Sequence, residues 1–308
     1  MIVSTSLAKV GQRQATPQHN ARSPSSDRAF VRPHPAPPQL TNPANDQNRT
    51  TIRPMADQNT PRAFSGIDRL YGNGAYAKLH NASVTIVGIG GVGSWAAEAI
   101  SRHAIQNINI IDLDNVAESN INRQLQALQT TLGMAKVDAI AQRIALINPD
   151  ATVSCVEDLL TPENVVDLLS SRPDAVIDCT DQTAAKVAMA EHCHQEGIAL
   201  FMAGAAGGRT DPTRIRHADL GASQGDALLA RVRALLRRNG RMTFARKDCF
   251  GIEAVYSAEP MRKPPVEACD ANASPQGLSC AGYGSSVCVT AGFGFALAAR
   301  AIEHLLKQ

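Results

Sequence analysis

The sequence of 308 residues lacks the features that mark secreted and membrane proteins. It has no apolar h-region near its start, so we expect no secretory signal. Its seven cysteines show no tight spacing, and an odd number of scattered thiols favours a reducing, cytoplasmic location over a disulfide framework. The apolar stretch 287–302 contains Arg300 and is short for a bilayer span. We therefore expect a buried helix there, packed through small residues, and no membrane span.

An excess of charge of one sign is also lacking. The net charge is +2, so no global field attracts nucleic acid, and any such contact must come from a local patch. The hydrophobic content of 44% is enough for a sizeable core. The length allows one large α/β domain or two small ones.

Apolar periodicity is missing from the first 54 residues, which are rich in Pro, Ser, Asn, Gln and Thr. Such a segment cannot repay the entropy of ordering, so we expect a disordered leader over residues 1–61. An Arg-rich, acid-poor leader fits an organelle transit peptide. We favour a second explanation, a misassigned start codon, because MADQNTPRAFSG from Met55 reads like a true start.

The remainder of the chain alternates between strands and helices. This alternation requires a parallel sheet with crossover helices, and a strand, a helix and a second strand after residue 204 suggest an antiparallel addition. We predict an α/β fold with a Rossmann-like, doubly wound, mostly parallel sheet and an antiparallel extension. The predicted strands are 83–89, 107–114, 152–157, 175–181, 198–204, 207–220 and 251–258. The predicted helices are 67–81, 92–103, 134–148, 162–170, 183–197, 226–240 and 287–302, and 259–280 is predicted to be loop.

A glycine-rich turn follows the first of these strands, in VTIVGIGGVGSWAAEAI. Gly88, Gly90 and Gly93 form a GxGxxG pattern between strand and helix, with Gly91 inside the turn. Such glycines let the backbone approach a phosphate closely, and the helix N-terminus adds partial positive charge. Asp112 ends the next strand, where an acid binds ribose hydroxyls. Together these features predict a nucleotide site.

NAD is the default ligand of such a turn, but the polar residues that follow favour ATP. Hydride transfer has no use for them. Attack on the α-phosphate of ATP needs cations that stabilise the pyrophosphate leaving group and carboxylates that hold Mg²⁺. An ordinary solvated loop would explain one charged residue better than a site does, but not six at successive strand ends. The six are Asp114, Asn120, Arg123, Gln124, Lys136 and Asp181.

The segments GIGGVG, DLD, SNINRQ, AKV and CTD, in this order and spacing, resemble the adenylating domain of ubiquitin-activating-like enzymes. Within that superfamily, FSGIDRLYG, INRQLQAL, GAAGGRTDPTRI and GYGSSVCVTAGFGFALA resemble the bacterial tRNA threonylcarbamoyladenosine dehydratases. The resemblance runs from about residue 62 to the C-terminus. It implies one ATP-binding adenylating domain over 62–308, with an inserted substrate-binding region at about 205–280.

The resemblance also implies a role for each matching residue. The nucleotide would be held by the phosphate loop, the ribose-binding acid and two neighbours: Gly88, Gly90, Gly91, Gly93, Asp112, Asp114 and Gln124. The catalytic set would comprise a polar pair near the phosphates, a lysine on the β/γ-phosphates, an acid linked to Mg²⁺ through ATP, and an arginine: Asn120, Arg123, Lys136, Asp181 and Arg69. Arg69 matches an arginine that reaches the partner subunit's ATP site, which implies a homodimer. An ordinary surface charge is the alternative for Arg69.

The implied reaction is an ATP-driven cyclisation of N6-threonylcarbamoyladenosine in tRNA. The threonyl carboxylate attacks the α-phosphate, giving an acyl-adenylate and pyrophosphate. A carbamoyl nitrogen or oxygen then closes a ring and AMP leaves, so one water is lost overall. The implied cofactors are ATP and Mg²⁺, and whether a monovalent cation is held near the C-terminal loops stays open.

Two departures from related enzymes bear on this expectation. The chain has no CxxC pair of the kind that zinc-bearing sulfur-carrier activators use, so we expect no zinc. Many dehydratase relatives carry a cysteine in a DCVFS-like strand, where this chain has Ala254, with Cys249 five residues earlier. A thioester or sulfur relay is therefore in doubt, and whether a cysteine desulfurase or sulfur-acceptor protein is a partner stays open. Adenylation is unaffected.

Three other functions are weighed against the dehydratase. The closest is adenylation of the C-terminus of a ubiquitin-like sulfur carrier, against which the missing CxxC pairs and Ala254 count. The second is an NAD-dependent dehydrogenase, against which SNINRQ and Lys136 count. The third is a scaffold that has lost ATP turnover, against which the intact polar set counts.

Residues 231–247 carry six arginines and one lysine. With tRNA as the substrate, we expect this stretch to bind RNA phosphates, chiefly through Arg237, Arg238 and Arg241. The alternative is an amphipathic helix with a solvated basic face, since Val232, Leu235 and Leu236 fit helical spacing.

Overall fold

The structure, a computed structural model, describes residues 60–242, 249–262 and 283–308. Most of the predicted leader over 1–61, including the start suggested at Met55, therefore lies outside the described residues. The same holds for 243–248 of the basic stretch and for most of the loop predicted over 259–280.

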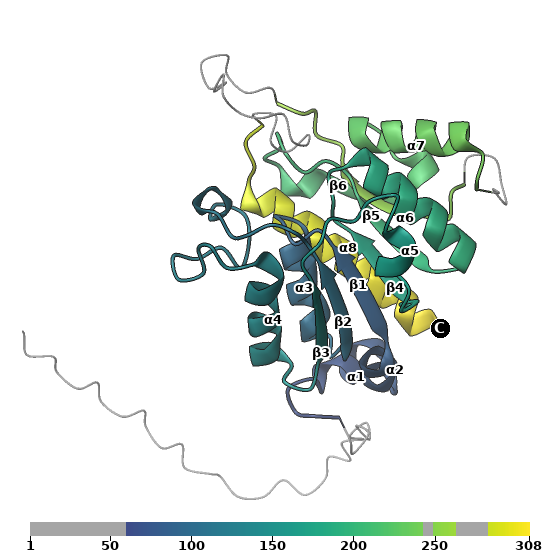
Figure 1. The fold of residues 1–308 in the computed structure, drawn as a ribbon. Helices are drawn as coiled ribbons and strands as arrows, with labels where there is room; N and C mark the ends of the chain where they lie inside the picture. Colours follow the sequence, from purple (N-terminus) through teal and green to yellow (C-terminus); the bar gives the residue numbers. More distant parts are fainter. Residues whose placement is uncertain (1–59, 243–248, 263–282) are drawn as a thin grey trace, which may run out of the picture. The chain divides into compact units, whose positions relative to one another are not determined.

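In the described residues, seven strands form one sheet. They are β1 (Ser83–Val87), β2 (Asn107–Ile111), β3 (Thr152–Val156), β4 (Ala175–Asp178), β5 (Ala199–Ala203), β6 (Ile215–Asp219) and β7 (Glu253–Ser257). Their order is β3-β2-β1-β4-β5-β7-β6 (Figure 1). All neighbours are parallel except β6 and β7, which are antiparallel. The predicted mostly parallel sheet with an antiparallel extension is confirmed.

Helices cover both faces of the sheet (Figure 1). They are α1 (Gly66–Tyr71), α2 (Ala75–Asn81), α3 (Gly93–Arg102), α4 (Lys136–Ile147), α5 (Val165–Leu168), α6 (Thr183–Glu196), α7 (Ala227–Asn239) and α8 (Val287–Lys307). Short 3₁₀ turns are η1 (Glu118–Asn120), η2 (Pro212–Arg214) and η3 (Leu220–Ala222). Successive strand side chains point to opposite faces. Ile86 and Ile177 accordingly join a core with α3, α4 and α8, whereas Val87 and Val176 join a core with α6 and α7.

The long apolar helix α8 packs across the first of these cores. Phe293 and Leu297 are fully buried, and the small residues Ala298 and Ala301 lie against the same core. Among the described residues, α8 is the one helix long and apolar enough to cross a bilayer, and half of its apolar window is buried inside the protein. The predicted buried helix is confirmed here.

The helical prediction for 67–81 is wrong in one respect, because the chain forms two helices there. Gly72 and Gly74 have φ angles of 100° and 85°, which a continuous right-handed helix does not allow. The helix predicted over 162–170 is also shorter, at Val165–Leu168. The glycine cap predicted after α6 is confirmed, since Gly197 is left-handed with φ 69°.

The strand order decides where the polar residues meet. Strands β1, β2, β4 and β5 are parallel neighbours, so the loops that follow them leave the sheet at one edge. Helices α1 and α2 lie at the opposite edge, because α2 leads directly into the start of β1 (Figure 1). A site built from strand ends is thereby separated from α1 within one chain.

Candidate active site

A cavity of about 930 Å³ opens at the carboxyl ends of β1, β2, β4 and β5. Ten of the residues predicted from the sequence line it: Gly88, Gly90, Gly91, Asp112, Asp114, Asn120, Arg123, Gln124, Lys136 and Asp181. They come from segments that are up to 93 positions apart, between 88 and 181. The parallel sheet therefore assembles the predicted nucleotide set at one place.

Gly93, the third glycine of the pattern, does not line the cavity but fixes the loop beneath it. A Cβ atom at Gly93 would lie 1.8 Å from the carbonyl oxygen of Gly88. No side chain fits there, so the start of α3 packs directly on the end of β1. Gly93 is thus a packing residue of the phosphate loop.

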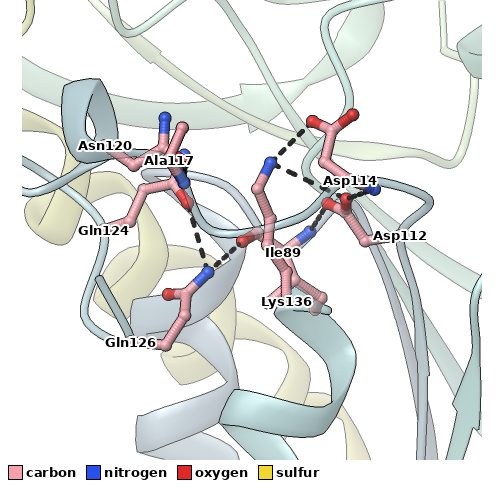
Figure 2. Close-up of polar contacts among 8 residues, drawn as sticks. All are labelled: Ile89, Asp112, Asp114, Ala117, Asn120, Gln124, Gln126 and Lys136. Carbon is pink, nitrogen blue, oxygen red and sulfur yellow. Dashed lines mark hydrogen bonds and ion pairs between the residues drawn. The ribbon is translucent and has the colours of Figure 1, made fainter. Parts of the chain in front are cut away.

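Asp112 joins the glycine turn to the end of β2 (Figure 2). Its Oδ2 accepts a hydrogen bond of 2.5 Å from the Ile89 amide, and its Oδ1 accepts one of 2.9 Å from the Asp114 amide. The carboxylate is 11% exposed. It holds the loop in shape and keeps part of its surface open to the cavity.

Lys136, the first residue of α4, reaches back to the two acids (Figure 2). Its Nζ lies 2.6 Å from Asp114 Oδ2 and 3.7 Å from Asp112 Oδ1. The Lys136 side chain is 6% exposed, whereas that of Asp114 is 73% exposed. A buried cation whose partner is exposed can exchange that partner for an incoming anion.

Asn120 and Gln124 are both buried, and each hydrogen-bonds within the loop that carries it (Figure 2). Asn120 Oδ1 accepts from the Ala117 amide at 3.0 Å. Gln124 Oε1 accepts from Gln126 Nε2 at 3.2 Å, and the same Nε2 donates to the Ile89 carbonyl at 2.8 Å. Gln126, which the sequence reasoning did not single out, thus connects this loop to the phosphate loop.

Arg123 brings a second cation to the cavity. Its Nη1 donates to the Ser119 carbonyl at 2.8 Å and to Asn122 Oδ1 at 3.0 Å, and its own carbonyl accepts from Trp95 Nε1 at 3.0 Å. These bonds fix both its backbone and its guanidinium. Arg123 and Lys136 are therefore positioned before any ligand arrives.

The turn that carries Asp181 is held by a buried ion pair that the sequence reasoning missed. Lys186 Nζ lies 3.0 Å from Asp178 Oδ2, and both side chains are 0% exposed. Asp178 Oδ1 accepts from the amide and the hydroxyl of Thr180, at 3.0 and 2.8 Å. The signal was a single lysine in the otherwise apolar middle of α6, eight positions after a strand-end acid.

Burial raises the pKa of two thiols, and one of the two lies on the cavity wall. Burial, and then the neighbouring Asp178, raises the pKa of the Cys179 thiol well above its usual range, so it stays protonated on the cavity wall. Burial raises the pKa of Cys193 to about 12. Ala254, where the resemblance to the dehydratases implies a cysteine, is fully buried in β7, whereas Cys249 is exposed. No described thiol therefore stands ready as a nucleophile inside the cavity.

The other predicted site residues lie outside the cavity. Arg69 is exposed on α1, at the opposite edge of the sheet, and its Nη2 lies 3.5 Å from Ser65 Oγ. Arg237, Arg238 and Arg241 are exposed at and beyond the end of α7. Arg237 lies over the Phe250 ring at 5.4 Å, and Arg241 pairs with Glu191 at 3.1 Å.

Carboxylates outnumber cations at the cavity. Asp112, Asp114, Asp158 and Asp181 line it together with Lys136 and Arg123. Within the described ranges, no group of three or more His, Cys, Asp or Glu side chains is arranged to hold a metal ion by itself. A divalent cation here would need oxygen ligands from a bound phosphate chain as well.

A protein-family model matches residues 65–307, a range that contains all the described residues that line the cavity. The chain belongs to the ThiF family. The tRNA threonylcarbamoyladenosine dehydratase of Haemophilus influenzae is 40% identical over 81% of this chain and 95% of its own length. That of Escherichia coli is 39% identical over 80% of this chain and 92% of its own.

A solved structure agrees with these relatives. The crystal structure of the Escherichia coli enzyme TcdA in complex with ATP matches with a TM-score of 0.72 and 37% identity, over 80% of this chain and 94% of that chain. The sequence resemblance to ubiquitin-activating-like adenylating enzymes, and to the dehydratases among them, is thereby confirmed. So is the ThiF-type α/β fold.

The buried Asp178–Lys186 pair yields a stability prediction. Replacing Lys186 with methionine leaves Asp178 buried without its cation, so the free energy of unfolding should fall by about 3–5 kcal/mol. Urea denaturation measures this change. Arg172→Met is the matched control, because it breaks an exposed Arg172–Glu196 pair of 3.2 Å and should cost less than about 1 kcal/mol. Equal losses in the two variants would contradict the assigned role.

Proposed function

We propose that the protein is an ATP-dependent tRNA threonylcarbamoyladenosine dehydratase that acts through a carboxyl-adenylate. The observation that carries the proposal is the meeting of the phosphate loop, Lys136, Arg123 and Asp181 at one cavity. The relatives that match most of the chain support the substrate, and the ATP complex of TcdA supports the nucleotide. None of these relatives is a dehydrogenase, which counts against NAD, and adenylation of a sulfur carrier is not favoured.

The proposed chemistry has two steps. The threonyl carboxylate attacks the α-phosphorus of ATP, and the bond to the pyrophosphate oxygen breaks. A carbamoyl nitrogen or oxygen then attacks the acyl carbon, and AMP leaves with the former carboxylate oxygen. Adenylation is needed because a free carboxylate is a poor electrophile, so the protein's part is to position the groups and stabilise charge.

The polar residues of the cavity divide the work of that reaction. The phosphate loop amides and Lys136 would bind the β- and γ-phosphates, and Arg123 would stabilise the departing pyrophosphate. Asn120 Oδ1 is occupied by the Ala117 amide, so its Nδ2 is the group that would donate to the phosphates. Asp112 would bind the ribose with its remaining acceptor positions.

The charges at the cavity support Mg²⁺ as a cofactor. Four carboxylates face two cations, so a bare triphosphate would meet net repulsion. Asp181 projects from the turn that the Asp178–Lys186 pair holds, and its carboxylate suits Mg²⁺ that is carried on the nucleotide. When bound, Mg²⁺ would neutralise the phosphate chain and the pyrophosphate formed from it.

The first test is a single reaction. The protein is incubated with Mg-ATP and tRNA that carries threonylcarbamoyladenosine, and the nucleosides are weighed after mild digestion. We expect loss of one water and formation of AMP. Lys136→Ala should lower kcat/KM by about 10²–10³-fold, as for loss of one preorganised donor. Lys307→Ala, on the exposed end of α8, is the matched control. An unchanged nucleoside with wild-type protein would contradict the proposal.

We also propose that the protein works as a homodimer. Arg69 does not reach the cavity of its own chain, because α1 lies at the edge of the sheet opposite the carboxyl ends of the strands (Figure 1). Beside it, Leu70 and Tyr71 are 73% and 44% exposed. Neighbouring exposed apolar side chains favour an interface. Arg69 would then reach the ATP of the partner subunit.

Mixing two inactive variants tests this arrangement. If Arg69 acts in trans, Arg69→Ala and Lys136→Ala together form heterodimers in which one of the two sites is intact. An equimolar mixture, denatured and refolded or co-expressed, should therefore regain roughly a quarter of wild-type activity. A mixture as inactive as its components would contradict action in trans.

We propose that α7 supplies part of the tRNA surface. It is an amphipathic helix, with Leu229, Val232 and Leu236 buried and with Arg231, Arg237 and Arg238 exposed. Arg237 and Arg238 are exposed, so an amphipathic helix and phosphate contacts are compatible, although Arg237 also lies over the Phe250 ring. Asp226 caps α7 and its Oδ2 also accepts from the Ala205 amide on the cavity wall at 2.9 Å. The start of α7 thus lies next to the cavity, and the proposed phosphate contacts follow at the other end of the helix.

Charge reversal tests the α7 surface. Arg237→Glu combined with Arg238→Glu should weaken tRNA binding at low salt. The slope of the logarithm of the binding constant against the logarithm of the salt concentration should become shallower by about 0.7–0.9 per lost phosphate contact. The measurement is fluorescence anisotropy over a salt series. Arg172→Glu combined with Lys307→Glu reverses the same charge elsewhere and should change binding less. Wild-type affinity at low salt in the α7 variant would refute the assignment.

A further inference from the structure

The cavity has two chemically different sides. The phosphate loop, Lys136 and Asp181 form a charged side. The other side is formed by residues 203–207, Leu228, Met261 and Tyr283, and none of these described residues is charged. The described residues of this side offer no cation to a phosphate, whereas a neutral and flat group would find a suitable surface.

Tyr283 and Met261 are held together on that uncharged side by one glycine. Gly208 has a φ of +69°, and a Cβ atom there would lie 2.7 Å from Met261 Cγ and 3.2 Å from Tyr283 Cδ1. Both side chains therefore pack against the bare Gly208 backbone. Each is half-buried, and each lines the cavity. The bare Gly208 backbone thus supports the Tyr283 ring at the cavity wall.

The backbone around this pair is tied down. The Gly208 amide donates to the Gly284 carbonyl and the Arg262 amide donates to the Gly208 carbonyl, each at 2.8 Å. Glu259 Oε2 accepts from the amides of Thr210 and Asp211, each at 2.9 Å. These two amides hold the pKa of Glu259 below its usual range. The support for Tyr283 is thus formed before a ligand binds, which lowers the entropic cost of binding.

We propose that Tyr283, supported by Met261, is the platform on which the base of the substrate adenosine stacks. The inference rests on the proposed function and names the contact through which the RNA enters. Single-stranded RNA loops are recognised by splayed bases that stack on aromatic side chains. A base on Tyr283 would direct its threonylcarbamoyl chain inward, toward the charged side where the α-phosphate lies.

The strand order distinguishes this base from the adenine of ATP. Asp112, the ribose acid, ends β2 on one side of β1, and Leu113 and Leu159 extend the cavity further toward β3. Residues 203–207 follow β5, which lies on the other side of β1 with β4 between them. An ATP whose ribose is bound by Asp112 directs its adenine away from Tyr283. The platform therefore serves the second substrate.

Binding without turnover tests the platform. The probe is a fluorescein-labelled anticodon stem-loop that carries threonylcarbamoyladenosine, titrated with protein and followed by anisotropy. Tyr283→Ala should weaken binding by roughly 5- to 150-fold, the range expected for one lost base–aromatic stack. The apparent Kd for ATP should not change. Leu146→Ala, which removes a side chain that is 87% exposed on α4, is the control for loss of apolar surface.

The outcomes separate this inference from the proposed function. Wild-type stem-loop affinity in Tyr283→Ala, or a weakened affinity for ATP alone, would overturn the platform. If Tyr283→Ala weakens stem-loop binding but the wild-type protein does not dehydrate the nucleoside, the platform is supported and the proposed reaction is contradicted. If Tyr283→Ala lowers the melting temperature, the titration is repeated with Met261→Ala. This second variant should also weaken stem-loop binding.

Discussion

The site depends on one carboxylate, that of Asp112. It accepts the Ile89 amide of the phosphate loop and the Asp114 amide of its own turn, and it faces Lys136 at 3.7 Å. Three segments of the chain therefore meet at this side chain: the loop after β1, the turn after β2 and the start of α4. Without this carboxylate, no shared contact would hold the loop amides and Lys136 in position relative to each other. The strand ends alone would then not make a phosphate site.

The ion pairs around that centre differ in what a ligand can change. Asp178 and Lys186 are fully buried, so their pairing is a fixed part of the fold. Asp114 is largely exposed, so its bond to Lys136 can be exchanged for one to a phosphate oxygen with little desolvation. The fixed pair thus holds the turn of Asp181 in place, and the exchangeable pair keeps Lys136 oriented at the cavity, as the proposed function requires.

The sequence was informative where chemistry follows a local pattern. The strand-glycine-helix pattern, the strand-end acids and the polar stretch that follows β2 predicted ten residues that do line one cavity, because parallel strands bring their ends together. Contacts between distant loops were not predictable, since no local pattern states which loops become neighbours. Gln126 and the Gly208–Met261–Tyr283 contact belong to this class. The break between α1 and α2 was missed because apolar periodicity continues across Gly72 and Gly74.

Helix α8 has a practical consequence for handling the protein. It begins four residues after Tyr283 and its last turn lies beside α2, where Lys78 Nζ donates to the Leu306 carbonyl at 2.9 Å. A helix of 21 residues is about 30 Å long. The carboxyl terminus is thus carried to the far edge of the sheet (Figure 1). A surface tether attached after Gln308 would leave the cavity mouth turned toward solution, which suits immobilised binding assays with large RNA.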